Sequence, residues 1–289
     1  MTGYRRGEPD GAPGRSGERG ASCPPVLSDQ EFRQFRTLLH EVAGISMSDA
    51  KKPLVSGRLA KRIRQCGLGS YSDYFRLLAR EQAELQVAVD LLTTNETYFF
   101  REPKHFEFLR EQILPPRRGP QKVRIWSGAC SSGEEPYSLA MTLADSLGQQ
   151  PWEVVASDIS TRVLEKARTG LYRLDDAQTL PRSTLIRHCL KGVGEHEGCF
   201  LVKPELRERI RFMQVNLNAP LPDLGDFDVI FLRNVMIYFD QETKRRVVRR
   251  LLPRLRPGGY FIVSHSESLN GVSDELRLVS PSIYRKPHA

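Results

Sequence analysis

Hydrophobic residues recur at two different spacings, and the change in spacing divides the chain in two. Between residues 26 and 90 apolar side chains return every three or four positions, as in Phe32, Phe35 and Leu39. This spacing is that of amphipathic helices, which bury one face against their neighbours. We therefore expect a small helical domain over residues 26–90.

Beyond Gly119, short apolar runs alternate with amphipathic stretches. The strand-like runs cover residues 123–126, 152–157, 211–215, 227–232 and 260–264, and helical stretches cover 136–147, 160–168 and 241–255. Such alternation is typical of a doubly wound α/β sheet, whose ligands bind at the carboxyl ends of the strands. The candidate chemistry should therefore lie in the loops that follow these strands.

The first 25 residues have neither pattern. They are rich in Gly, Pro, Arg and Ser and contain almost no aliphatic side chains, so they cannot bury enough surface to offset the entropy lost on ordering. We expect a disordered tail over residues 1–25. No apolar run approaches the length of a membrane span, and no apolar segment follows the N-terminal arginines, so we expect no membrane insertion and a cytoplasmic location.

Charge adds a preference for acidic partners. The chain has 43 Lys and Arg against 35 Asp and Glu, a net charge of +8, which suits nucleic acid, anionic lipid or an acidic protein surface. Its five cysteines form no C-x-x-C pair, which argues against both a disulfide framework and a zinc site. Residues 51–64 contain no acid, and on a helix Arg58, Lys61 and Arg62 form a basic ridge that is either a solvated face or a docking surface.

The loop after the first strand, residues 127–136, has the composition of a ligand-binding loop. Gly128 and Gly133 have the glycine spacing of a nucleoside-triphosphate loop, but Glu134 follows where that loop needs lysine. The G-x-G-x-x-G pattern of dinucleotide sites is absent. Acidic side chains repel phosphate and favour a ligand that carries an ammonium or sulfonium cation. This chemistry points to S-adenosylmethionine.

Three further features of the loops after the predicted strands are less specific as evidence for a ligand. Ser132 and Glu135 have the spacing of a capping box at the start of the following helix. Asp158 ends the second strand, where it either holds ribose hydroxyls or caps the next helix together with Ser160. The pair Asn216-Leu217 ends the third strand-like run and by itself is consistent with a simple turn.

Three segments together resemble the CheR-type chemotaxis receptor methyltransferases. They are Thr93-Thr94-Asn95-Glu96-Thr97-Tyr98-Phe99-Phe100-Arg101, the loop from Trp126 to Ser138, and Phe231-Leu232-Arg233-Asn234-Val235-Met236-Ile237-Tyr238-Phe239-Asp240. His265-Ser266-Glu267 adds to the match. The resemblance covers about residues 26–285, and the joint occurrence of these motifs is highly specific.

The resemblance implies a Rossmann-like class I S-adenosylmethionine methyltransferase domain over residues 91–289. A small antiparallel β-subdomain should be inserted near residues 191–211, with short strands at 199–202 and 208–212. Ala129 departs from the family pattern, which usually has glycine there. The family's cofactor-binding residues fall on Asn95, Thr97, Arg101, Glu134 or Glu135, Asp158, Asn216, Leu217, Arg233 and Asn234.

The family's reaction transfers the methyl group to glutamate side chains on the cytoplasmic helices of methyl-accepting chemotaxis receptors, giving S-adenosylhomocysteine. A free glutamate, with a pKa of about 4.3, is already ionised at neutral pH, so neither a general base nor a metal is needed. We therefore expect Arg101 and Tyr238 to align the carboxylate or the cofactor. From the residues alone, the favoured readings are an ion pair of Arg101 with Glu96 or Glu102 and ordinary packing of Tyr238 beside Phe239.

The family also gives the basic ridge a partner, because receptor methylation helices are acidic. We expect a monomer, recruited from the cytoplasm to membrane receptor arrays. A nucleic-acid methyltransferase is disfavoured, because residues 233–236 are Arg-Asn-Val-Met rather than an N/D-P-P-Y/F motif and no Pro-Cys nucleophile exists. A regulatory module that binds the cofactor without catalysis is the second alternative, disfavoured by the presence of both Arg101 and Tyr238.

Overall fold

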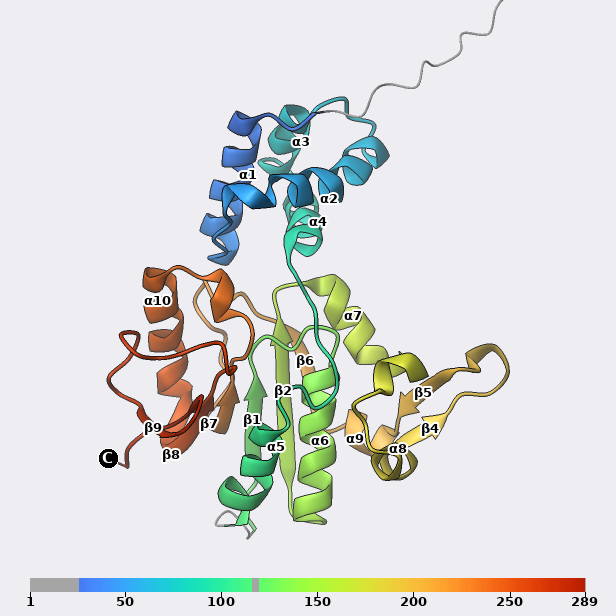
Figure 1. Cartoon of the computed structure of the whole chain (residues 1–289), viewed down its shortest axis with the longest axis vertical. Coiled ribbons are helices and arrows are strands. Elements are labelled where there is room, and N and C mark those ends of the chain that lie inside the picture. Colours follow the sequence, from blue (N-terminus) through green and yellow to red (C-terminus); the bar gives the residue numbers. More distant parts are fainter. Residues whose placement is uncertain (1–25, 116–119, 289) are drawn as a thin grey trace, which may run out of the picture.

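A computed structural model of the protein describes residues 26–115 and 120–288. The tail expected over residues 1–25 lies outside the described residues. A helical unit lies above the carboxyl ends of the parallel strands of a twisted sheet, and a single stretch of chain after α4 leads from the helical unit to the sheet (Figure 1). The helical domain and the doubly wound α/β sheet expected from the two hydrophobic periods are both present.

The helical unit contains α1 (Asp29–Ala43), α2 (Lys52–Gln65), α3 (Tyr71–Leu78) and α4 (Gln82–Leu92). Ser28 and Glu31 form a capping box at the start of α1, and Gly44 ends that helix in the left-handed conformation. The apolar faces of the four helices meet in a core of their own that includes the fully buried Val55, Leu59 and Tyr71.

Within the described chain, seven strands form the main sheet in the order β6-β2-β1-β7-β8-β10-β9. The first five are parallel, and β10 and β9 close one edge antiparallel. The bounds are β1 (Val123–Ser127), β2 (Trp152–Asp158), β6 (Ile210–Gln214), β7 (Phe227–Phe231), β8 (Leu255–Ile262), β9 (Arg277–Ser280) and β10 (Ile283–Arg285).

Alternate residues of the central strands point to opposite faces of the sheet and build two cores. Ile125 and Val229 pack on the face covered by α6 (Glu134–Leu147) and α7 (Thr161–Thr169). Trp126 and Ile230 pack on the other face, which α10 (Gln241–Leu251) covers. The turn after Phe108 continues the short helix α5 (Lys104–Phe108) as a π-helix and lies with the first core.

A separate three-stranded antiparallel sheet is present, but it begins earlier in the chain than the expected 191–211. It consists of β3 (Leu171–Arg173), β5 (Cys199–Val202) and β4 (Cys189–Lys191), with α8 (Arg182–His188) between them and α9 (Pro204–Arg207) after them. The expected short strand at 208–212 is not part of it, because residues 210–214 form β6 and pair in parallel with β2. A three-residue strand such as β3 is too short to show a hydrophobic period in the sequence.

Candidate active site

A cavity of about 390 Å³ lies between the helical unit and the carboxyl ends of β1, β2 and β7. Its floor comes from the loops after those strands, and its roof comes from residues 43–54 of the helical unit and from the connecting segment at 92–97. This is the place where a doubly wound sheet binds its ligand. The sequence-predicted residues that line it are Asn95, Thr97, Arg101, Glu135, Asp158, Asn216, Leu217, Arg233, Asn234 and Tyr238.

The loop after β1 is held tightly against the sheet. Gly133 has a φ of +100°, and a Cβ there would lie 2.7 Å from the hydroxyl of Tyr172, so only glycine fits. The expected capping box of Ser132 with Glu135 is wrong. Gly133 is the N-cap of α6, and the Ser132 hydroxyl instead donates to the Glu134 carboxylate at 2.7 Å.

The two glutamates at the start of α6 have different surroundings. Glu135 lines the cavity, where its oxygens accept from the Ser127 hydroxyl at 2.7 Å and from the Arg233 guanidinium at 2.8 Å. Glu134 is buried away from the cavity lining, and that burial raises the pKa of its carboxyl. Only Glu135 is therefore placed to meet a ligand in this cavity.

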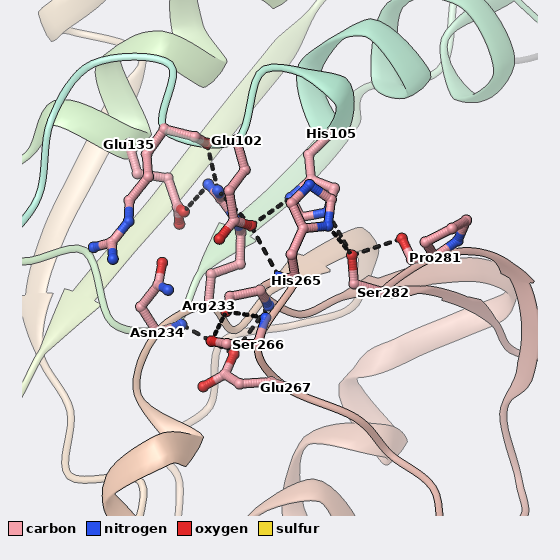
Figure 2. Close-up of polar contacts among 12 residues, drawn as sticks. Glu102, His105, Glu135, Arg233, Asn234, His265, Ser266, Glu267, Pro281 and Ser282 are labelled. Atoms are coloured by element: carbon pink, nitrogen blue, oxygen red, sulfur yellow. Dashed lines mark hydrogen bonds and ion pairs between the residues drawn. The ribbon is translucent and has the colours of Figure 1, made fainter.

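The side chain of Arg233 is buried next to Glu135 in the wall of the cavity. It forms ion pairs with Glu135 at 2.8 Å and with Glu102 at 3.1 Å, and it also donates to the backbone carbonyl of Arg101 (Figure 2). A guanidinium between two carboxylates has a fixed orientation. Arg233 thereby joins three segments that are distant in sequence.

Asp158 lies at the cavity and is bonded to the backbone on both sides of it, but it does not cap α7, and its contact with ribose hydroxyls stays a prediction. Its carboxylate accepts from the Ser160 N–H at 3.0 Å, at the start of α7, and from the Ser131 N–H at 2.8 Å in the loop after β1. Its side chain also lines the cavity, and its burial raises the pKa of the carboxyl. Ser131 has a φ of +48°, so this pairing holds the loop in an unfavourable conformation beside the cavity.

Asn216 connects the sheet to the helical unit. Its amide nitrogen donates to the Val42 carbonyl at 2.7 Å, at the end of α1. Asp90 of α4 makes a second connection by accepting from both the N–H and the hydroxyl of Thr161, at 3.1 and 2.7 Å. These contacts hold the roof of the cavity over its floor.

Arg101 and Tyr238 both face the cavity. The Arg101 guanidinium donates to the Glu96 carbonyl at 2.9 Å and lies 5.6 Å from the centre of the Tyr98 ring. No carboxylate in the described part of the chain forms an ion pair with it, since Glu102 pairs with Arg233 instead. The alternative of a structural ion pair for Arg101 is therefore not realised. Tyr238 is half-buried and in the lining, and its backbone carbonyl accepts from the Ser46 N–H at 2.7 Å.

The three residues of the basic ridge differ in whether their charged groups are already bonded within the protein. Arg62 makes a bidentate pair with the buried Glu84 at 2.8 and 2.6 Å, and Arg58 donates to the carbonyls of Leu92 and Thr93. Lys61 is exposed. The sequence could not show this, because Glu84 lies on another helix, far along the chain.

We expect Arg62→Ala to lower the free energy of unfolding by about 2–3 kcal/mol, because it leaves Glu84 buried without its cation. The value lies below that of a fully buried pair, since the Arg62 side chain is 32% exposed. The guanidinium lowers the pKa of Glu84 in the folded protein. The stabilisation from the pair is therefore complete at pH values above the pKa of Glu84 in the unfolded chain, and it is lost as the pH falls through the lower pKa of Glu84 in the folded protein. The loss should therefore shrink below about pH 4.

Urea unfolding at pH 7 and at pH 3.5 measures this difference. The matched control is Lys61→Ala on the same helix, which should change stability by less than about 0.5 kcal/mol at either pH. An equal loss in the Arg62 and Lys61 variants at neutral pH would contradict the role given to the pair.

Glu102, His105 and His265 offer potential metal-ligand atoms within 4.8 Å of one another, a group that the sequence did not predict. The geometry does not favour a cation there. The same Glu102 oxygen already accepts from Arg233 and, at 3.2 Å, from the backbone N–H of His265. Burial, and after it the charge of Arg233, lowers the pKa of His105 to about 3, and the same positive charge would repel a cation at this group. In the described chain no helix is both long and apolar enough to cross a membrane.

Comparison with known proteins agrees with this geometry. The family described as the all-alpha domain of CheR methyltransferase matches residues 30–93, and the SAM-binding domain of CheR methyltransferase matches residues 95–284. A "Chemotaxis protein methyltransferase" of Salmonella typhimurium is 45% identical over 268 residues, covering 90% of this chain and 91% of the relative. The relative of the same name in Escherichia coli is 44% identical over 264 residues, with the same coverage. A "Chemotaxis protein methyltransferase 2" of Pseudomonas aeruginosa is 42% identical, covering 90% and 96%.

The sheet order, the cavity at the carboxyl ends of its strands and these matches define an S-adenosylmethionine-dependent methyltransferase. More particularly, the chain belongs to the CheR methyltransferase family.

Proposed function

We propose that the protein methylates glutamate side chains in the cytoplasmic helices of methyl-accepting chemotaxis receptors and so supports chemotactic adaptation. The products are glutamate methyl esters and S-adenosylhomocysteine. The names of the relatives support a chemotaxis protein as the substrate. The proposal rests chiefly on Arg101, a cation in the cavity lining that has no carboxylate partner among the described residues.

The residues of the cavity suit the cofactor. S-adenosylmethionine supplies an electrophilic methyl group on a sulfonium centre. Glu135 offers a carboxylate to the ammonium group and Asp158 one to ribose hydroxyls, while Asn95, Thr97, Asn216 and Asn234 add polar groups around them. Leu217 contributes an apolar wall.

Arg101 and Tyr238 align the acceptor in this proposal. A guanidinium can bind a carboxylate through two parallel N–H donors, which fixes the acceptor's orientation. Orientation of two reactants contributes on the order of 7–11 kcal/mol to a barrier, whereas a base adds nothing to an acceptor that is already ionised. No metal is required for this displacement, and none is proposed.

The direct test is transfer of a tritiated methyl group to membranes that contain a chemotaxis receptor, preceded by calorimetry with S-adenosylmethionine and S-adenosylhomocysteine. We expect both ligands to bind and base-labile radioactivity to appear on the receptor. Binding without transfer to any receptor would favour a regulatory module instead. Labelling of nucleic acid in place of the receptor would favour the other alternative.

We further propose that acidic receptor helices dock on the exposed face of α2 while the enzyme works as a monomer at receptor arrays. Arg58 and Arg62 support this face structurally, so Lys61 carries the sharper test. Lys61→Glu should raise the KM for receptor about three- to tenfold at low salt, and less at high salt, because exposed charges are screened.

The matched control for Lys61 is Arg249→Glu, which changes the charge equally at an exposed position of α10. Cofactor affinity by calorimetry should be unchanged in both variants. Equal KM values for the two variants, or a parallel loss of cofactor affinity, would count against docking at α2.

A further inference from the structure

The loop between β7 and α10 carries six cavity-lining residues, among them Arg233, Asn234 and Tyr238, yet has little regular structure. Asn234 has a φ of +57°, and one 3-10 turn over Met236–Tyr238 follows it. A non-glycine residue in the left-handed region persists only where surrounding contacts fix it. Something outside the loop must therefore hold its backbone.

Glu267, in the segment after β8, provides that contact. One of its carboxylate oxygens accepts from the Asn234 N–H at 3.0 Å and from the Ser264 N–H at 2.9 Å. The other accepts from the Ile237 N–H at 3.1 Å. Figure 2 shows Glu267 beside Asn234, on the side away from His105. Within residues 26–115 and 120–288, no ion pair joins a basic side chain to Glu267.

We propose that Glu267 is a positioning residue for methyl transfer, whose carboxylate holds the backbone of residues 234–237 so that Asn234 and Tyr238 face the cavity. This inference rests on the proposed function, because it assumes that Tyr238 aligns the acceptor. It assigns Glu267 a mechanical role through the loop, without contact between Glu267 and the reacting atoms.

The chemistry of the site favours glutamate over its amide. An ionised carboxylate is acceptor-only, so both oxygens can receive N–H groups. Glutamine has one oxygen and one NH₂, so one backbone N–H would face another donor. The loop would then move at Asn234 or at Ile237, depending on how the amide is turned.

The far end of the loop has an independent anchor. The backbone carbonyl of Tyr238 accepts from the backbone N–H of Ser46, and Phe239 forms a single β-bridge with Ile45 of the helical unit. Loss of the Glu267 contacts should therefore shift residues 234–237 without unfolding the segment. The expected consequence is slow catalysis in a folded enzyme.

The experiment compares Glu267→Gln with Glu275→Gln, a matched change at an exposed position in the same connection between β8 and β9. Methyl transfer is measured as kcat per mole of S-adenosylhomocysteine-binding sites. We expect kcat per site to fall about ten- to a hundredfold in Glu267→Gln, with the KM for receptor within about threefold of wild type. Glu275→Gln should match wild type.

A role in folding alone would reduce the number of binding sites and leave kcat per site unchanged, which would overturn the proposal. The double variant Glu267→Gln/Tyr238→Phe provides a second measurement. If Glu267 acts through the loop, Tyr238→Phe should slow the Glu267→Gln enzyme less than it slows wild type. Fully multiplicative effects would overturn the proposal.

Glu267→Asp keeps two acceptor oxygens and the charge and should have a kcat between those of Glu267→Gln and wild type. It also serves if the glutamine variant does not fold. An aspartate variant slower than the glutamine variant would count against the proposed contact. Failure of the proposed function itself is distinguishable, because wild-type enzyme would then label no receptor.

Discussion

Arg101→Ala should lower kcat/KM for receptor methylation by about a hundred- to a thousandfold while the protein remains folded. Arg101 faces the cavity and donates to a backbone carbonyl, and no carboxylate among the described residues neutralises it. Its removal therefore costs little stability but takes away the charge that orients the acceptor. The rate is measured by tritiated-methyl transfer under subsaturating receptor.

Two variants separate charge from geometry at this position. Arg101→Lys keeps the charge and loses the two-pronged donor, so an intermediate rate is expected. Arg80→Ala, at an exposed position after α3, is the matched control and should leave the rate unchanged. If Arg101→Ala and Arg80→Ala methylated receptor equally well, an aligning role for Arg101 would be excluded.

The second large effect is expected at Glu135. Glu135→Gln should weaken S-adenosylhomocysteine binding about ten- to a hundredfold, because the ammonium group loses a charged acceptor. The same change removes one of the two carboxylates that flank Arg233, which leaves a buried guanidinium facing an amide. Isothermal calorimetry at neutral pH measures the affinity.

Glu134→Gln is the matched comparison, one residue earlier on the same helix. Burial raises the pKa of Glu134, so a neutral side chain that still accepts from Ser132 should be tolerated. We expect cofactor affinity within about threefold of wild type. If Glu134→Gln weakened cofactor binding more than Glu135→Gln, then Glu134 rather than Glu135 would be the residue that contacts the cofactor.

Periodicity was sufficient to predict most of the strands and helices that build the two cores, but it missed β10, whose Ile283 and Tyr284 pack into them. The expected strand at 123–126 and helix at 136–147 differ from β1 and α6 by at most two residues. The strand is a short apolar run buried on both faces of the sheet, and the helix has apolar residues at helical spacing on one face, so each had a clear pattern in the sequence. The three-residue strands of the small sheet, and β9 with its two exposed apolar side chains, have no such pattern and were not predicted.

The motifs brought together ten of the eleven expected cofactor and aligning residues, but not the contacts that support them. Glu134 is the exception, because consecutive residues at a helix start point in different directions and the sequence could not say which faces the ligand. The pairing of Glu102 with Arg233 joins positions 131 residues apart, and no local signal reports such a contact. The same holds for Glu84 beneath the basic ridge.

The cavity has walls from two bodies that each possess a separate hydrophobic core. A ligand bound there contacts both the helical unit and the sheet domain, and it is fully desolvated only while the two stay together. Its binding therefore stabilises the contact between them. Mass action then makes each body more resistant to heat and proteases whenever the cofactor or its product is abundant. Cutting the chain between α4 and α5 would separate the walls of the cavity, so neither fragment would retain a complete binding surface.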